Sequence, residues 1–89
     1  MERIIGPIRG YYIASYASEA GEAWIAYSKI CRSRPESYWD AQGSAKVRSY
    51  RAHSRPEAAV ADAEVQARRQ AEILNTIDYS RTHFAAAVR

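Results

Sequence analysis

A run of small residues at helical spacing is the feature that most constrains how this chain can fold. Between positions 58 and 74 the sequence is dense in Ala, Gln, Glu and Arg, which are good helix formers. Such a helix has little bulk on its apolar side, so it must pack closely against a surface of large side chains. The apolar positions recur at intervals of three and four residues and share one predicted helix face: Val60, Ala63, Ala67, Ala71 and Leu74.

The start of this helix is predicted from the sequence Ser54-Arg55-Pro56-Glu57. In a capping box the serine hydroxyl accepts a hydrogen bond from the third helical N–H, and the glutamate reaches back to the cap. Pro56 falls in the first turn, where its missing N–H has no intrahelical partner to lose. We therefore expect Ser54 to cap the helix.

The polar side of the same helix is predicted from its charges. Glu64 stands four residues before Arg68, the orientation in which such a pair stabilises an exposed helix. Asp62 and Glu64 are both expected to face solvent and to interact favourably with the N-terminal half of the helix.

Large side chains that could face the helix lie earlier in the chain. Segments 11–17 and 23–31 are rich in aromatic and β-branched residues, which favour strands. The polar segment 18–21 between them ends in Gly21, a residue able to adopt positive φ, so the two segments are predicted to form an antiparallel hairpin. Segment 45–53 alternates small or apolar residues with basic and polar ones, which predicts a third, half-solvated strand.

The order of these elements predicts an α+β fold, β-β-β-α, in which one long C-terminal helix packs across a three-stranded antiparallel sheet. With 89 residues the chain can support one core. We expect residues 1–75 to form a single domain that opens with a leader or a short edge segment. Residues 76–89 are expected to be a tail, either a second short helix or disordered. Several unrelated small domains share this element order, so fold analogy assigns no function.

Targeting segments are not expected. Gly6, Pro7 and Gly10 interrupt the N-terminal region where a secretory signal would need a continuous apolar stretch, and no segment approaches the length of a membrane span. Cys31 is the one cysteine, so no intramolecular disulfide can form, and we expect it to be a buried free thiol. These features predict a cytoplasmic protein with no membrane partner.

Catalytic chemistry is not predicted either. Cys31, His53 and His83 do not follow any of the common metal-binding spacings, and the glycines are dispersed rather than gathered in a phosphate-binding loop. In the predicted sheet Cys31 and His53 fall at opposite ends of adjacent strands, which argues against a Cys-His dyad. We expect a non-enzymatic domain without a metal or cofactor.

Basic charge concentrates in the middle of the chain. Residues 29–55 contain seven bases against two acids, a local balance of +5, whereas the whole chain has a net charge of +3. Basic side chains interleaved with aromatic rings are typical of nucleic-acid binding, because the cations neutralise phosphates while the rings stack on nucleobases. A solvated strand whose arginine stems cover aromatic rings would give the same pattern. The predicted nucleic-acid contacts are Arg32, Arg34, Trp39, Lys46, Arg48, Tyr50 and Arg51.

A second hypothesis comes from the first two strands, because both of their faces carry large apolar side chains. Tyr11 and Ile13 alternate with Tyr12 and Tyr16, and one helix cannot cover both sets. Either segments 32–44 and 76–89 wrap the second face, or its aromatic residues form a contact surface for another protein or a second copy. Nucleic-acid binding requires the basic side chains to share a face with exposed rings, whereas a protein interface requires an apolar centre with few charges.

Overall fold

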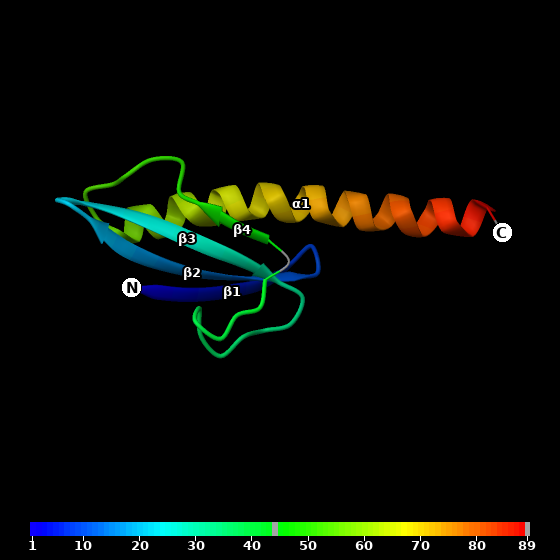
Figure 1. Cartoon of the computed structure of the whole chain (residues 1–89), viewed down its shortest axis with the longest axis horizontal. Helices are drawn as coiled ribbons and strands as arrows, with labels where there is room; N and C mark the ends of the chain where they lie inside the picture. Colours follow the sequence, from blue (N-terminus) through cyan, green and yellow to red (C-terminus); the bar gives the residue numbers. More distant parts are fainter. Residues whose placement is uncertain (44, 89) are drawn as a thin grey trace.

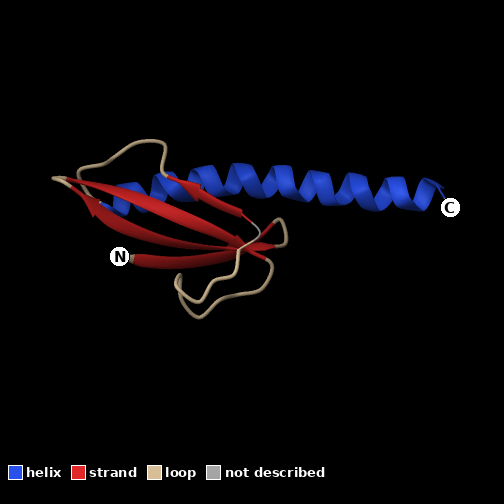
Figure 2. Cartoon of the chain, viewed as in Figure 1, coloured by secondary structure: helices blue, strands red, loops and turns tan. Residues whose placement is uncertain are grey.

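The computed structural model describes the backbone of residues 1–43 and 45–88, and the side chains of that range up to residue 77 (Figure 1). Four strands form one antiparallel sheet in sequence order, and a single long helix packs across one face of it (Figure 2). The α+β class and the long C-terminal helix are confirmed, with four strands rather than three. The elements are β1 (Glu2–Ile8), β2 (Tyr11–Ala20), β3 (Ala23–Cys31), β4 (Ala45–Arg48) and α1 (Pro56–Val88).

The additional strand is β1, the segment predicted as a leader or short edge segment. It pairs with β2 from Glu2↔Tyr16 to Ile5↔Ile13, and again at Ile8↔Tyr11 after a register shift. Gly6 lies within that shift with a φ of 129°, and a Cβ at this position would come within 2.9 Å of the Tyr11 carbonyl oxygen. The Gly-Pro step therefore shifts the pairing register of the edge strand without ending the strand.

The predicted hairpin of β2 and β3 is confirmed. Pairing runs without a shift from Tyr12↔Cys31 to Ala20↔Ala23, so β2 extends three residues beyond the predicted end at Ala17. Gly21 occupies the turn with a φ of 67°, a left-handed conformation that glycine adopts without strain. This register fixes which side chains of both strands lie on each face of the sheet.

The predicted strand over 45–53 is shorter than expected, because regular pairing ends at Arg48. Ser49 continues the contact with β3: its N–H donates to the Ala26 carbonyl at 2.8 Å, and its hydroxyl accepts from the Ala26 N–H at 3.2 Å. An isolated bridge joins His53 to Trp24. Between Ser49 and His53 the chain leaves the sheet and crosses to α1.

The predicted apolar face of the helix is confirmed. Val60, Ala63, Ala67 and Ala71 are fully buried, and the partly buried Leu74 packs against the cluster that contains Ala67 and Ala71. The sheet offers larger partners at the same depth, above all Ile13 of β2 and Ile30 of β3, both with 0% exposure. Small helix residues against large sheet residues let α1 lie close to the strands, which is the packing that the sequence implies.

The opposite face of the sheet is covered in part by the loop that follows β3. This loop swings back beneath the sheet toward β1 (Figure 1) and buries Tyr38 and Ala41 against Ala14 and Cys31. Cys31 is a buried free thiol, as predicted, and burial raises the pKa of that thiol. The loop was one of the two segments expected to wrap this face.

Segment 76–88 does not wrap the sheet. No break follows Asn75, and α1 continues to Val88 and extends past the end of the sheet (Figure 1). The expected separate helix or frayed tail is thus replaced by one helix of 33 residues. Residue 89, the last of the expected tail, lies outside the described residues.

The N-terminus of α1 differs from the predicted capping box by one residue. Pro56 is the first helical residue, and the carbonyl of Arg55 accepts the bond from the Ala59 N–H at 3.2 Å. Arg55 therefore occupies the cap position, and Ser54 lies one residue too early to serve there.

Asp62 and Glu64, which we expected to face solvent, both lie in contacts with other elements. The Asp62 carboxylate accepts hydrogen bonds from two backbone N–H groups of the chain that follows β4, and Glu64 pairs with Arg3 of β1. Their side chains are only 12% and 9% exposed. The prediction was wrong because the helical spacing does not show that other segments fold over the flanks of α1.

Candidate nucleic-acid interface

Basic side chains and aromatic rings share the sheet face that α1 leaves uncovered. Arg48 of β4 lies opposite Tyr27 of β3, which lies opposite Tyr16 of β2, and Lys46 lies opposite Lys29 in the next row. Directly opposed residues of antiparallel strands point to the same side of the sheet. Val47, which alternates with these bases on β4, packs instead into the core beneath α1. We call this surface the basic-aromatic face: Tyr16, Tyr27, Lys29, Trp39, Lys46 and Arg48.

Trp39 reaches this face from the loop after β3. Its ring centroid lies 4.9 Å from that of Tyr16 and 5.1 Å from that of Tyr38, with edge-to-face angles of 61° and 87°. The rings of Tyr16 and Tyr38 are themselves stacked at 5.7 Å. Trp39 is nevertheless 65% exposed, whereas Tyr38 is 3% exposed. Three rings thus form an ordered cluster whose outermost member is open to solvent.

The cations of this face divide into structural and available groups. Lys29 is half-buried: its Nζ lies 4.3 Å above the Tyr38 ring and donates to the Tyr38 carbonyl at 3.0 Å. Lys46 and Arg48 are exposed, and the Lys46 Nζ lies 5.0 Å from the centroid of the Tyr27 ring. In the part of the chain that the structure describes, no carboxylate pairs with either of them. Their charges are therefore available to an anionic ligand.

Acidic charge lies at the other edge of the same face. Glu2 of β1 is opposite Tyr16, and its carboxylate accepts a hydrogen bond from the Tyr38 N–H at 2.7 Å. In the loop, the Asp40 carboxylate accepts from the Ser37 hydroxyl at 3.0 Å. The face is thus polarised, with its free cations on β4 and its acids toward β1 and the loop.

Three of the seven predicted contact residues meet on this face: Trp39, Lys46 and Arg48. Tyr50 and Arg51 do not join them, since their N–H groups donate to Asp62 of α1 at 3.0 and 3.2 Å. The Arg32 guanidinium lies 5.5 Å from the ring of Tyr11, a core residue beneath the helix. Arg34 lines a shallow loop hollow that also contains two acids, Glu36 and Asp40.

The predicted contact residues did not include Tyr16, Tyr27 and Lys29. The signal that could have found them is the hairpin register, because a two-residue turn at Gly21-Glu22 pairs Tyr16 with Tyr27. Alternation then places Lys29 on the same side of β3 as Tyr27.

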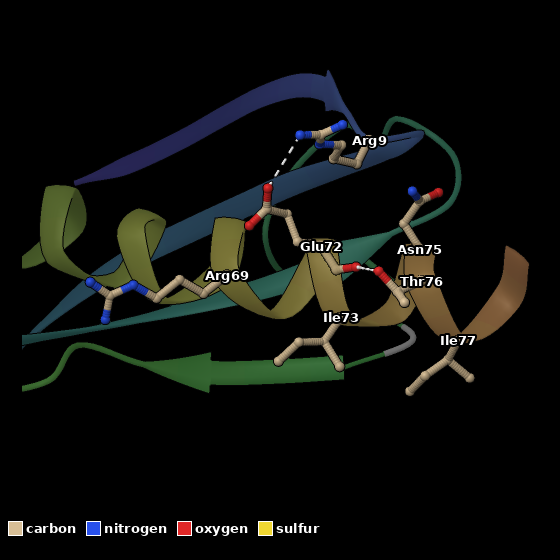
Figure 3. A pocket seen from close by; sticks show the side chains of 7 residues that line it. All are labelled: Arg9, Arg69, Glu72, Ile73, Asn75, Thr76 and Ile77. Atoms are coloured by element: carbon tan, nitrogen blue, oxygen red, sulfur yellow. Dashed lines mark hydrogen bonds and ion pairs between the residues drawn. The ribbon is translucent and has the colours of Figure 1, made fainter. Parts of the chain in front are cut away.

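A second surface lies on the outer side of α1, away from the sheet. A hollow of about 690 Å³ is lined by Arg9 of the β1–β2 turn and by six residues of α1 (Figure 3): Arg69, Glu72, Ile73, Asn75, Thr76 and Ile77. Arg9 Nη2 lies 3.2 Å from a carboxylate oxygen of Glu72, whose own carbonyl accepts a bond from the Thr76 hydroxyl at 2.9 Å. Ile73 and Ile77 are 51% and 47% exposed here. We call this surface the α1 hollow.

Fold and surface together define a small α+β domain: a four-stranded antiparallel meander closed by a helix on one face and lined with bases and rings on the other. No protein-family model, curated protein or solved structure matches this chain. Its function must therefore be inferred from its own residues.

Within the described residues, no helix combines the length and the apolar character needed to cross a membrane.

Proposed function

We propose that this domain binds nucleic acid through the basic-aromatic face, without reading a defined sequence. The observation that supports the proposal is the location of Lys46 and Arg48, unpaired among the described residues, on the same sheet face as Tyr27 and the exposed Trp39. This is the arrangement required of a nucleic-acid surface. Phosphates neutralised by such cations release condensed counterions, and this release supplies most of the affinity of sequence-independent binding.

A protein interface on the same face is less well supported. The cores of protein interfaces are depleted in charged residues. On this face the charged residues are mixed with the tyrosines of β2 and β3 and do not form a rim around an apolar centre: Lys29, Lys46 and Arg48.

The test is the salt dependence of binding to a fluorescent oligonucleotide of mixed sequence. Binding of the wild-type protein should weaken steeply with salt, and Lys46→Gln with Arg48→Gln should flatten the log–log slope by about 1.4 to 1.8, which corresponds to two phosphate contacts. The matched control is Arg55→Gln with Arg68→Gln, which removes the same charge from exposed positions at the start and on the outer side of α1, outside both surfaces. This control should leave the slope close to that of the wild type.

Two results would contradict the proposal. One is an absence of binding to single- or double-stranded nucleic acid at low salt. The other is an equal loss of slope in the strand and helix variants, which would mean that overall charge and not the basic-aromatic face determines binding.

We also propose self-association through the α1 hollow as a second function. Ile73 and Ile77 supply an exposed apolar centre, and Arg9, Arg69 and Glu72 place both signs of charge around it. A two-fold interface brings a surface against a copy of itself, so a charged patch is self-complementary when it carries charges of both signs. The α1 hollow is self-complementary in this sense, whereas the basic β4 edge would repel its copy.

A further inference from the structure

We infer that the nucleic acid bound by this face is single-stranded and that one of its bases stacks on Trp39. This inference rests on the proposed function and adds the class of nucleic acid and the residue that recognises it. Stacking on aromatic side chains tolerates any base, because every base has a π-face.

The Trp39 ring is positioned before any ligand arrives. Contacts with Tyr16 and Tyr38 hold it at centroid distances of 4.9 and 5.1 Å, and Tyr38 is in turn buried and bonded through its backbone to Glu2 and Lys29. A side chain ordered in this way loses little conformational freedom when it binds. Its 65% exposure leaves room for a further ring.

The spacing between the ring cluster and the free cations suits a short single strand. Tyr16, which contacts Trp39, is separated from Arg48 by two strand spacings, about 10 Å at the usual spacing within a sheet. Nucleotides follow at roughly 3.4 Å along the axis of a fully stacked strand and farther apart in an extended one. A strand of a few nucleotides is therefore long enough to reach from Tyr16 to Arg48.

A duplex would not use the same features. Its bases stack on one another and expose only their edges in the grooves, where a protruding helix or two-stranded ribbon usually reads them. Among the residues that the structure describes, no protruding helix or two-stranded ribbon lies on this face beside Lys46 and Arg48. A duplex could reach these two cations with its phosphates, but Trp39 would have no exposed base to contact.

The chain provides its own control, because its second tryptophan lies on the other side of the sheet. Trp24 packs against the helix-side cluster that contains Ala26, Ala59 and Val60. Trp24→Phe leaves Trp39 as the only indole, and Trp39→Phe leaves Trp24. Each variant is titrated at low salt with a single-stranded oligothymidylate, an abasic strand of the same length and a duplex of that length.

We expect the oligothymidylate to quench the fluorescence of the Trp24→Phe protein but not that of the Trp39→Phe protein. Trp39→Ala should weaken binding of the oligothymidylate about tenfold, and Trp39→Phe should restore most of it. The abasic strand should bind the wild-type protein about tenfold more weakly, with the same salt slope. Circular dichroism of Trp39→Ala checks that the variant is folded.

Three results separate the inference from the proposed function. Salt-dependent binding with equal affinity for the abasic strand would overturn the stacking but leave nucleic-acid binding in place. Tighter binding of the duplex than of the single strand would overturn the single-strand assignment alone. A lack of salt-dependent binding to any of the three probes would overturn the proposed function and the inference together.

Discussion

Two guanidinium nitrogens of Arg3 in β1 contact the two carboxylate oxygens of Glu64 in α1, although the two residues are 61 positions apart in the sequence. Arg3 Nε lies 2.9 Å from Glu64 Oε2, and Nη2 contacts the other carboxylate oxygen. The glutamate is 9% exposed and the arginine 43% exposed, so the pair closes the rim of the core where the edge strand meets the helix. Two parallel hydrogen bonds of this kind fix orientation as well as distance.

Loss of Arg3 should therefore destabilise the fold. Arg3→Gln leaves the buried Glu64 carboxylate without its partner, and we expect a cost of about 1–3 kcal/mol in the free energy of unfolding. Glu64→Gln added to that variant should restore part of the loss. Arg9→Gln is the control, because Arg9 and Glu72 form an exposed pair, and it should cost less than about 1 kcal/mol. Urea denaturation measures all three, and equal costs for Arg3 and Arg9 would contradict the structural role of the buried pair.

Acid should weaken the attachment of the post-β4 chain to α1. Burial alone would raise the pKa of Asp62, but hydrogen bonds from His53, the Tyr50 N–H, Gln66 and the Arg51 N–H lower it from 3.8 to about 2. A lowered pKa in the folded state means that the stabilisation is complete above about pH 4 and is lost as the pH falls through 3.8 toward 2. We expect a contribution of roughly 2 kcal/mol. Asp62→Asn should remove this part of the pH dependence of the free energy of unfolding, measured in denaturation curves. An unchanged dependence at acid pH would show that the hydrogen bonds to Asp62 do not stabilise the fold.

A buried pair of hydroxyls beneath the helix allows a double-mutant test. Ser15 Oγ and Ser28 Oγ lie 2.6 Å apart on adjacent strands, and both residues are 0% exposed. Ser15→Ala should cost about 1–3 kcal/mol, because it leaves the Ser28 hydroxyl without this partner. Substituting both serines by alanine should cost less than the sum of the single substitutions. Additive costs in thermal or urea denaturation would show that the two hydroxyls are not coupled.

Self-association through the α1 hollow predicts a concentration-dependent dimer. Ile73→Glu with Ile77→Glu places charges at the apolar centre of that surface, so the dimer should dissociate in sedimentation velocity experiments at tens of micromolar protein, because buried charge is costly. Trp39→Ala, on the opposite side of the sheet, should leave the dimer intact. A monomeric wild-type protein, or a dimer that only Trp39→Ala disrupts, would exclude this interface.

The helix could be predicted from the sequence more completely than the rest of the fold, because its core face depends only on local spacing. Val60, Ala63, Ala67 and Ala71 are buried as their spacing implies. The edge strand β1 was not predicted in full, because glycine and proline interrupt its pattern and its pairing with β2 depends on a register shift. The cap at Arg55 was missed because Ser54 and Glu57 match the capping-box pattern, whereas arginine is not among the residues favoured at a cap.

For the basic-aromatic face, the residue types could be predicted but not their grouping. Lys46 and Arg48 share a face because they alternate on one strand, which is a local property. Arg51 is separated from them by the bonds that Asp62 makes to the chain after β4, a contact between distant segments that no local pattern encodes. Glu64 was assigned to solvent for the same reason, because its partner Arg3 lies at the far end of the chain.

Each strand of the sheet pairs with its neighbour in the sequence, whereas the helix that covers them comes last. During synthesis the meander can therefore form early from local contacts, while the apolar face holding Ile13 and Ile30 stays uncovered until residues 59–74 leave the ribosome. A nascent chain that pauses before Pro56 would expose a complete sheet with an uncovered apolar side, a surface that hydrophobic chaperone sites recognise and that promotes aggregation.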